Sequence, residues 1–147
     1  MRSLEPVSET WARPLLLVAR LGMASLAVFG GLEKIFKYPD AVNFAAAYDI
    51  PFPRETMPVA IAVELGCALL LFVPRYCRVA ALVLAVWTFV LGVWFHRFWA
   101  VPAAEWQMMI DSFFHHFVMT GGFIYVAVFG TGSTGSSRTQ ATHTSAA

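Results

Sequence analysis

The sequence predicts an all-α fold: a transmembrane antiparallel four-helix bundle with a short interfacial helix in its first loop. Of the 147 residues, 59% are hydrophobic and only 13% are charged, whereas charged residues make up about 25% of an average soluble domain. Aromatic residues reach 15%, which suits Trp and Tyr anchors at the two bilayer surfaces. Four apolar stretches with short connections complete the pattern, so we expect one integral membrane domain.

These four stretches have the composition of membrane spans, since about 20 apolar residues cross the hydrocarbon core of a bilayer. The first begins at Pro14, a residue that suits the first turn of a helix. The second is near the short limit for crossing, and the third is rich in Val, Leu and Ala. The expected spans are Pro14–Phe36, Met57–Val73, Arg78–Phe98 and Gln107–Gly130.

The connections are short except for the first, Lys37–Thr56. Asp40 stands near the start of a segment in this loop that can form a short helix in the membrane interface. Extended backbone should follow at Ile50–Pro53, because a residue that precedes proline avoids the α region. The last loop, Trp99–Trp106, combines proline with tryptophans and resembles an interfacial belt.

The ends of the chain differ from its centre. The first apolar run contains Arg20 and is too long for a cleavable signal, so we expect it to be retained as a span. The tight turn with Arg75 and Arg78 favours the cytoplasmic side, which would place both termini in the cytoplasm. The tail is rich in Gly, Ser and Thr and should be disordered. The expected division is an N-terminal cytoplasmic segment 1–13, a membrane domain 14–130 and a tail 131–147.

Several classes of function are disfavoured. The formal net charge of +1 does not suggest nucleic acid binding, and no glycine-rich nucleotide motif occurs. Cys67 and Cys77 would lie about 15 Å apart on a continuous helix, whereas a disulfide needs Cα atoms within about 7 Å. No Cys or His pattern predicts an iron–sulfur cluster or an attached haem. Electron transfer would therefore need a lipid-soluble carrier or a partner protein.

Ionisable residues are expected to converge in one half of the bilayer. Glu64 lies inside the second span, where an acid must be paired, buried or used. In an up-down arrangement, spans one and three end on the side where spans two and four begin. Glu64 then lies about 10 Å from that side, and the span-four histidines about 12 Å. The residues brought to this half are Glu33, Lys34, Glu64, His96, Arg97, Asp111, His115 and His116.

The pairing among these residues is open at this point. Glu64 has three candidate partners: Lys34, which would keep the carboxylate charged, His96, and one of the two adjacent histidines. His115 and His116 are turned about 100° apart on a helix, so only one can point into the bundle. Asp111 and His115 are one turn apart and could pair. Arg20 belongs to the opposite half, where it either snorkels to the surface or has a role inside the bundle.

The order of these motifs resembles the DoxX family. The first span carries Arg20, a glycine at position 30 or 31, and Lys34 near its end. The segment AYDIPFP resembles the stretch before the family's second span, where Glu64 and Gly66 match an acid followed by small residues. His96 and the pair Gly121-Gly122 also fit, so the resemblance covers about residues 13–130. The His115-His116 pair departs from the pattern.

The resemblance implies a four-span protein of the bacterial plasma membrane that is associated with oxidoreductase systems. Relatives occur as the membrane subunit of a thiosulfate:quinone oxidoreductase and as membrane anchors of redox-defence assemblies. The implied partners are the lipid bilayer and either proteins of a redox complex or further copies of the chain, and the implied cofactor is a quinone that is not covalently bound.

Three functions are compatible with the chain: a quinone-linked subunit of an oxidoreductase, a non-catalytic anchor whose polar residues form a static network, and a small transporter. Transport is least favoured, because no span has a mid-membrane proline and no internal repeat is visible. A metal site is not expected, since adjacent histidines point apart and no HxxxH spacing occurs. The catalytic candidates are Glu64, Lys34, His96, His115 and His116; the quinone-binding candidates are Lys34, Glu64, Trp94, Phe95, His96 and Phe114; Arg20 and Asp111 are expected to be structural.

Overall fold

A computed structural model of the chain describes residues 9–129. Every regular element in this range is helical, as predicted. The expected tail 131–147 and the first eight residues of the expected N-terminal segment lie outside the described residues. The elements are α1 (Glu9–Phe36), α2 (Tyr38–Ala47), α3 (Pro53–Leu70), α4 (Cys77–Phe95), a 3₁₀ turn η1 (Phe98–Ala100) and α5 (Ala103–Phe129).

Three of the long helices begin several residues earlier than predicted, α1 at Glu9, α3 at Pro53 and α5 at Ala103. α1 begins five residues before Pro14, so this proline lies inside the helix and not in its first turn. Proline has no N–H, so it removes one hydrogen bond to the preceding turn. α3 begins at Pro53, four residues before the predicted start at Met57. A proline is well suited to the first position of a helix.

Three helical segments of the described part are long and apolar enough to cross a membrane: Pro14–Phe36, Cys77–Ala100 and Ala103–Phe129. The first coincides with the predicted span. α3 is not among the three, although it forms a helix of 18 residues where the second span was expected. The difference is one of composition, because α3 carries three charged residues, Arg54, Glu55 and Glu64.

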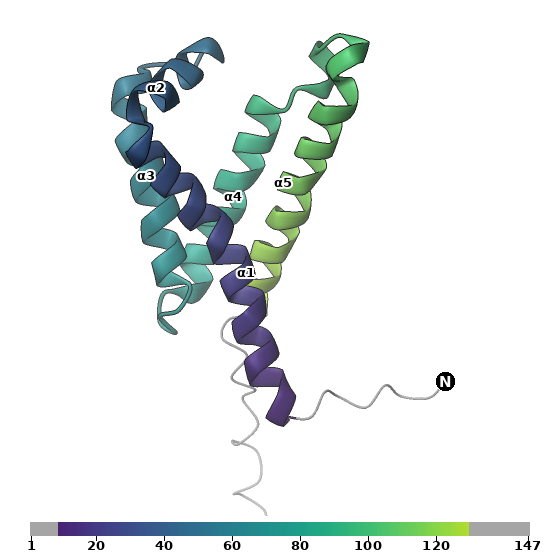
Figure 1. Cartoon of the computed structure of the whole chain (residues 1–147). Coiled ribbons are helices and arrows are strands. Elements are labelled where there is room, and N and C mark those ends of the chain that lie inside the picture. The colour runs from purple at the N-terminus through teal and green to yellow at the C-terminus, as the bar shows by residue number, and fades with distance from the viewer. Residues whose placement is uncertain (1–8, 130–147) are drawn as a thin grey trace, which may run out of the picture.

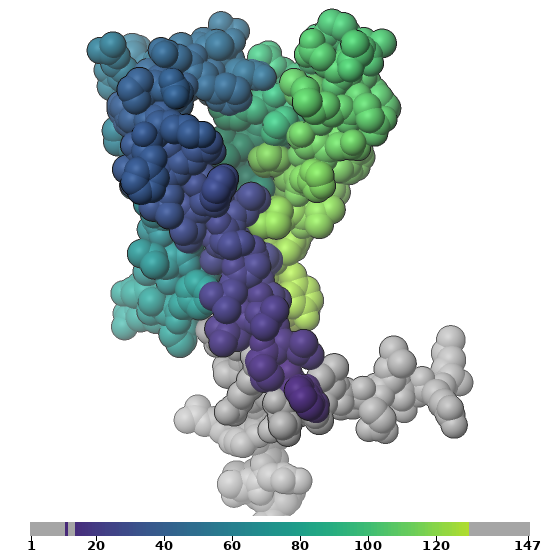
Figure 2. Space-filling model, in the orientation of Figure 1, coloured from purple at the N-terminus to yellow at the C-terminus, as the bar shows by residue number. Residues whose placement is uncertain are grey.

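The four long helices run alternately up and down and form two arms (Figure 1). α1 and α3 pack together and carry α2, whereas α4 packs along α5. Contacts of α3 with α4 and of α1 with α5 join the arms. The arms meet near the turn between α3 and α4 and diverge toward the end that carries α2 and η1 (Figure 1). The space-filling view shows the molecule hollowed between them (Figure 2).

The hydrophobic core lies at the closed end. It is rich in small side chains of α4, which allow neighbouring helices to approach closely. Phe123 of α5 and Leu71, at the end of α3, are the largest core side chains and are almost completely buried. The buried members are Ala24, Ala68, Leu71, Cys77, Ala80, Ala81, Leu84, Ala85, Phe123 and Val126.

α2 ends in a hydrogen-bonded reversal of the chain. The N–H of Ile50 bonds to the carbonyl of Ala45, and the N–H of Asp49 bonds to that of Ala46. These bonds form a Schellman motif, which places Asp49 in the left-handed region at φ 57°. Phe52 is also left-handed, at φ 50°. The expected extended backbone is therefore wrong at Phe52, because the chain must turn back here to start α3.

α2 is held against both arms. On the α3 side, Tyr38 donates a hydrogen bond of 2.9 Å to the carbonyl of Arg54. On the other side, the rings of Phe44 and Tyr48 lie 5.3 and 5.1 Å from that of Phe95 at the end of α4. The indole of the adjacent Trp94 donates to the carbonyl of Tyr48 at 2.9 Å. α2 thus bridges the open end of the molecule.

Candidate functional site

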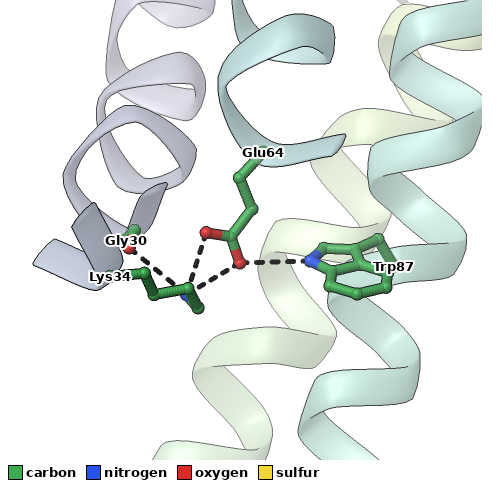
Figure 3. A network of polar contacts seen from close by, with 4 residues as sticks. All are labelled: Gly30, Lys34, Glu64 and Trp87. Atoms are coloured by element: carbon green, nitrogen blue, oxygen red, sulfur yellow. Dashed lines mark hydrogen bonds and ion pairs between the residues drawn. The ribbon is translucent and has the colours of Figure 1, made fainter. Parts of the chain in front are cut away.

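The buried charge of α3 is neutralised by α1. Nζ of Lys34 lies 2.9 and 2.8 Å from the two carboxylate oxygens of Glu64, as Figure 3 shows. The same ammonium group donates to the carbonyl of Gly30 at 3.3 Å. Glu64 is only 4% exposed, so these hydrogen-bond donors take the place of water around its carboxylate. Of the partners considered from the sequence, the structure selects Lys34.

Two glycines of α1 make this pairing possible. A Cβ on Gly31 would lie 2.7 Å from the side chain of Leu65, closer than real contacts allow. A Cβ on Gly30 would lie 3.3 Å from Oε2 of Glu64. The absence of side chains at both positions lets α1 approach α3 closely, which is a common use of glycine between membrane helices.

The third donor to the carboxylate comes from the other arm. Nε1 of Trp87 on α4 donates a hydrogen bond of 3.1 Å to Oε1 of Glu64 (Figure 3). Sequence reasoning missed this residue as a site member. A signal was present, because a tryptophan in the middle of an apolar span needs an acceptor for its N–H, and Glu64 is the acid nearest in depth.

The two histidines that face each other are His96, at the end of α4, and His116 on α5. Their ring centroids are 4.8 Å apart. His116 also contacts the carbonyl of Ser112 through Nδ1, at 2.9 Å. Gly92 provides the space, since a Cβ there would lie 2.8 Å from Cβ of His116. Of the adjacent histidines, His116 is half-buried and His115 is exposed.

Two adjoining cavities lie between the arms, of about 560 and 310 Å³. We call them together the cleft. Lys34, Glu33, Leu91 and His116 border both. The larger cavity is further lined by Lys37, Asp40, Ala41, Phe44, Ala45, Met57, Phe95 and His96. The smaller is further lined by Leu26, Ala27, Phe29, Gly30, Glu64, Leu84, Trp87, Thr88, Met119 and Phe123.

Several predicted site residues lie elsewhere. Asp111, Phe114 and His115 are exposed on α5 and line neither cavity. The reason is the helical rotation of about 100° per residue, which turns them away when His116 faces inward. Trp94 lines neither cavity, because its indole bonds to the carbonyl of Tyr48. These positions do not support the expected roles of Trp94 and Phe114 beside a quinone ring, or of His115 in proton transfer.

The residues expected to be structural behave differently from each other. Asp111 accepts a hydrogen bond of 3.0 Å from Gln107, one turn earlier on α5. Arg20 lies half-buried on α1, toward the closed end.

Within residues 9–129, no group of three or more His, Cys, Asp or Glu side chains is placed to hold a metal ion.

The cleft combines apolar walls with hydrogen-bonding groups. Lys34 can donate hydrogen bonds, and the two imidazoles can donate, accept and transfer protons. Phe44 and Phe95 supply aromatic surface near the mouth. Such a cavity suits a planar, largely apolar molecule with polar atoms at its edge.

The sequence profile of the DoxX family matches residues 15–97, which is more than half of the chain. The chain belongs to the DoxX family. No curated protein and no solved structure is significantly similar to it. Together with its long apolar helices, the family assignment makes this DoxX chain an integral membrane protein.

The family match covers only part of the cleft. In this DoxX protein, Lys34, Glu64, Trp87 and His96 lie inside the matched segment. α5 lies beyond it, and with it His116 and the Gly121-Gly122 pair that the resemblance had included. The ion pair and its indole donor are thus located in the family's domain, whereas one of the two facing histidines is located outside the match.

Proposed function

We propose that this DoxX protein is the membrane subunit of an oxidoreductase complex and binds a quinone headgroup in the cleft. The observation that supports this most directly is the cleft itself. Its volume of about 560 Å³ in the larger cavity falls within the range of small-molecule sites, about 300–1,000 Å³. Apolar and aromatic walls meet Lys34, His96 and His116 there.

In this proposal α3 serves as the fourth membrane span and α2 lies in the interface. The charge of Glu64 is the main obstacle to placing α3 in lipid, and Lys34 removes that obstacle by forming the ion pair. Arg54 and Glu55 stand at the first turn of α3, where a headgroup region would solvate them. The membrane proposed is the bacterial plasma membrane, with both termini in the cytoplasm.

The chemistry assigned to the cleft residues follows from their positions. His96 and His116 donate hydrogen bonds to the quinone carbonyls and pass protons as the quinone is reduced. Phe44 and Phe95 pack against the ring. Reduction of the quinone needs an electron donor. The sequence contains no recognised motif for a nucleotide cofactor or an iron–sulfur cluster, so the electrons come from a partner subunit.

Glu64 has a positioning role in this proposal. Both of its oxygens already accept hydrogen bonds from Lys34, and Oε1 accepts one from Trp87. A carboxylate with these donors stabilises the two arms relative to each other. It therefore keeps the cleft in shape and leaves the proton transfer to the histidines.

Binding of a short-tailed ubiquinone analogue to the full chain in lipid nanodiscs tests the proposal. The variant His116→Leu should weaken binding about tenfold, because a buried hydrogen bond to a ligand contributes about 1–2 kcal/mol. His115→Leu is the matched control, since this neighbouring histidine points away from the cleft. No binding above that of empty nanodiscs, or equal binding by the two variants, would refute the assigned site.

A second function is favoured by one observation. Lys34 and Trp87 already donate hydrogen bonds to the carboxylate of Glu64, so this polar cluster resembles a structural network. A non-catalytic anchor that holds redox proteins at the membrane would need nothing more. Copurification of soluble redox proteins by a chain that binds no quinone would support this alternative.

A further inference from the structure

We propose that the outward face of α5 is the interface of a homodimer, in which Asp111 and His115 of one copy pair with His115 and Asp111 of the second. The proposal concerns the side of α5 opposite the cleft, so it does not depend on the proposed quinone site. It starts from polar groups that the described part of the chain leaves exposed at membrane depth.

α5 is packed on one side only. It lies at the outer edge of the molecule, beside α4 (Figure 1), and its buried residues Thr120, Phe123 and Val126 face inward. A second stripe runs along the opposite side of the helix at i, i+4, i+7 and i+11 spacing. Its members are all exposed: Gln107, Asp111, Phe114, Val118, Gly121 and Tyr125, with His115 at its border.

Two of these residues are costly in lipid. α5 has 27 residues, which corresponds to about 40 Å of helix, and the hydrocarbon core is about 30 Å thick. When the helix is centred in the bilayer, Asp111 lies about 7.5 Å from the midplane and His115 within about 2 Å of it. Trp106 then falls at the headgroup level, where tryptophan is enriched. Ionisable groups at this depth normally face protein or water.

A second copy fits this face because the face is self-complementary. A two-fold axis along the membrane normal places the two α5 helices side by side and parallel, so the contact is the same from both copies. Asp111 is an acid and His115, one turn deeper, is a base. Within its own chain Asp111 accepts a hydrogen bond from Gln107. A carboxylate has room for further donors, so Asp111 of each copy can also accept from His115 of the other, and two symmetric pairs form.

The same face has a place where the two helices can approach closely. Gly121 is exposed, and a Cβ added to it would meet nothing within 4 Å. The neighbouring Gly122 is instead used inside the chain, against Met23 of α1. Gly121 lies about 1.7 turns below His115 on this stripe, and a small residue at such a position allows two membrane helices to approach closely.

Disulfide formation in native membranes, with the full chain, tests the proposal. Val118→Cys places a thiol on the stripe, and Val79→Cys places one on α4 as a matched control. The two valines are similarly exposed, at 71% and 64%, and the native cysteines are buried or half-buried. Oxidation should convert Val118→Cys to a covalent dimer and leave Val79→Cys largely monomeric. Equal dimer yields from the two variants would overturn the proposal.

The polar pair is tested in the Val118→Cys background. Asp111→Leu with His115→Leu should raise the dimer dissociation constant about tenfold, because hydrogen bonds between membrane helices contribute about 1–2 kcal/mol. Asp111→Asn with His115→Gln removes the ionisable groups with less change in shape and should act in the same direction. Retained cross-linking in both double variants overturns the pairing. A purified parent chain of monomeric mass overturns the homodimer, and α5 would then be the contact for a different subunit.

Discussion

Nε1 of Trp87 lies 3.1 Å from Oε1 of Glu64, and this hydrogen bond joins the arm that carries α4 to the ion pair between α1 and α3. The three groups belong to three helices (Figure 3), and all three line the smaller cavity of the cleft. The bond therefore supports the cleft at its inner end.

Replacing Trp87 by phenylalanine should destabilise the protein by about 2 kcal/mol, because a buried carboxylate loses one of its donors. Thermal unfolding in detergent, followed by circular dichroism, measures the effect. Trp94→Phe is the matched control. It removes the same N–H from an exposed hydrogen bond to Tyr48, and its loss should stay below about 1 kcal/mol. Equal losses would contradict the assigned importance of the Trp87 bond.

The ion pair should show strong coupling in a double-mutant cycle. Lys34→Met and Glu64→Gln should each destabilise the protein by about 3–5 kcal/mol if the remaining group keeps its charge in a buried site. The double variant should cost clearly less than the sum, because no charge is then left alone.

The matched control for this cycle is the pair Lys37 and Glu33, which is exposed and one turn apart on the surface. Its coupling should be only about 0.3–0.5 kcal/mol. The stability of all variants is compared in the same detergent. Additive losses at Lys34 and Glu64 would show that the contact between them does not stabilise the fold.

A methyl group on Gly31 should separate α1 from α3. The new Cβ would overlap with Leu65, and overpacking of this kind costs about 1–3 kcal/mol. Gly22→Ala, on the same helix, meets nothing within 4 Å and should be neutral or stabilising by up to about 1 kcal/mol. Thermal unfolding of the two variants gives the comparison. A Gly31→Ala protein as stable as Gly22→Ala would mean that the close approach is unnecessary.

The attachment of α2 to α4 depends on the ring of Phe44, which lies against both Tyr48 and Phe95. Aromatic pairs contribute about 0.5–1.5 kcal/mol, so Phe44→Leu should speed amide exchange in α2 by about tenfold through local opening. Hydrogen exchange measured by mass spectrometry reports this change. Phe36→Leu serves as the control, because Phe36 is 80% exposed. Unchanged exchange in α2 would show that other contacts hold it.

Much of the fold was predictable because membrane helices leave a strong signal. The apolar stretches and the proline positions were sufficient to locate α1, α2, α4 and α5 within a few residues. The rise of about 1.5 Å per residue also sets the depth of each polar side chain along its helix. That is why Lys34, Glu64, His96 and His116 could be expected at one level of the molecule.

The sequence alone determined the helical character of this protein, its membrane-embedded nature and the position of its charges along each helix, since these depend on hydrophobicity and on distance along one helix. Only the tertiary structure decided the rotation and separation of the helices. It paired Glu64 with Lys34 and Trp87, turned His116 inward and His115 outward, and opened the arms into a cleft. These outcomes depend on packing between helices, where small residues such as Gly31 and Gly92 face bulky ones. No local sequence pattern specifies which face of one helix contacts which face of another.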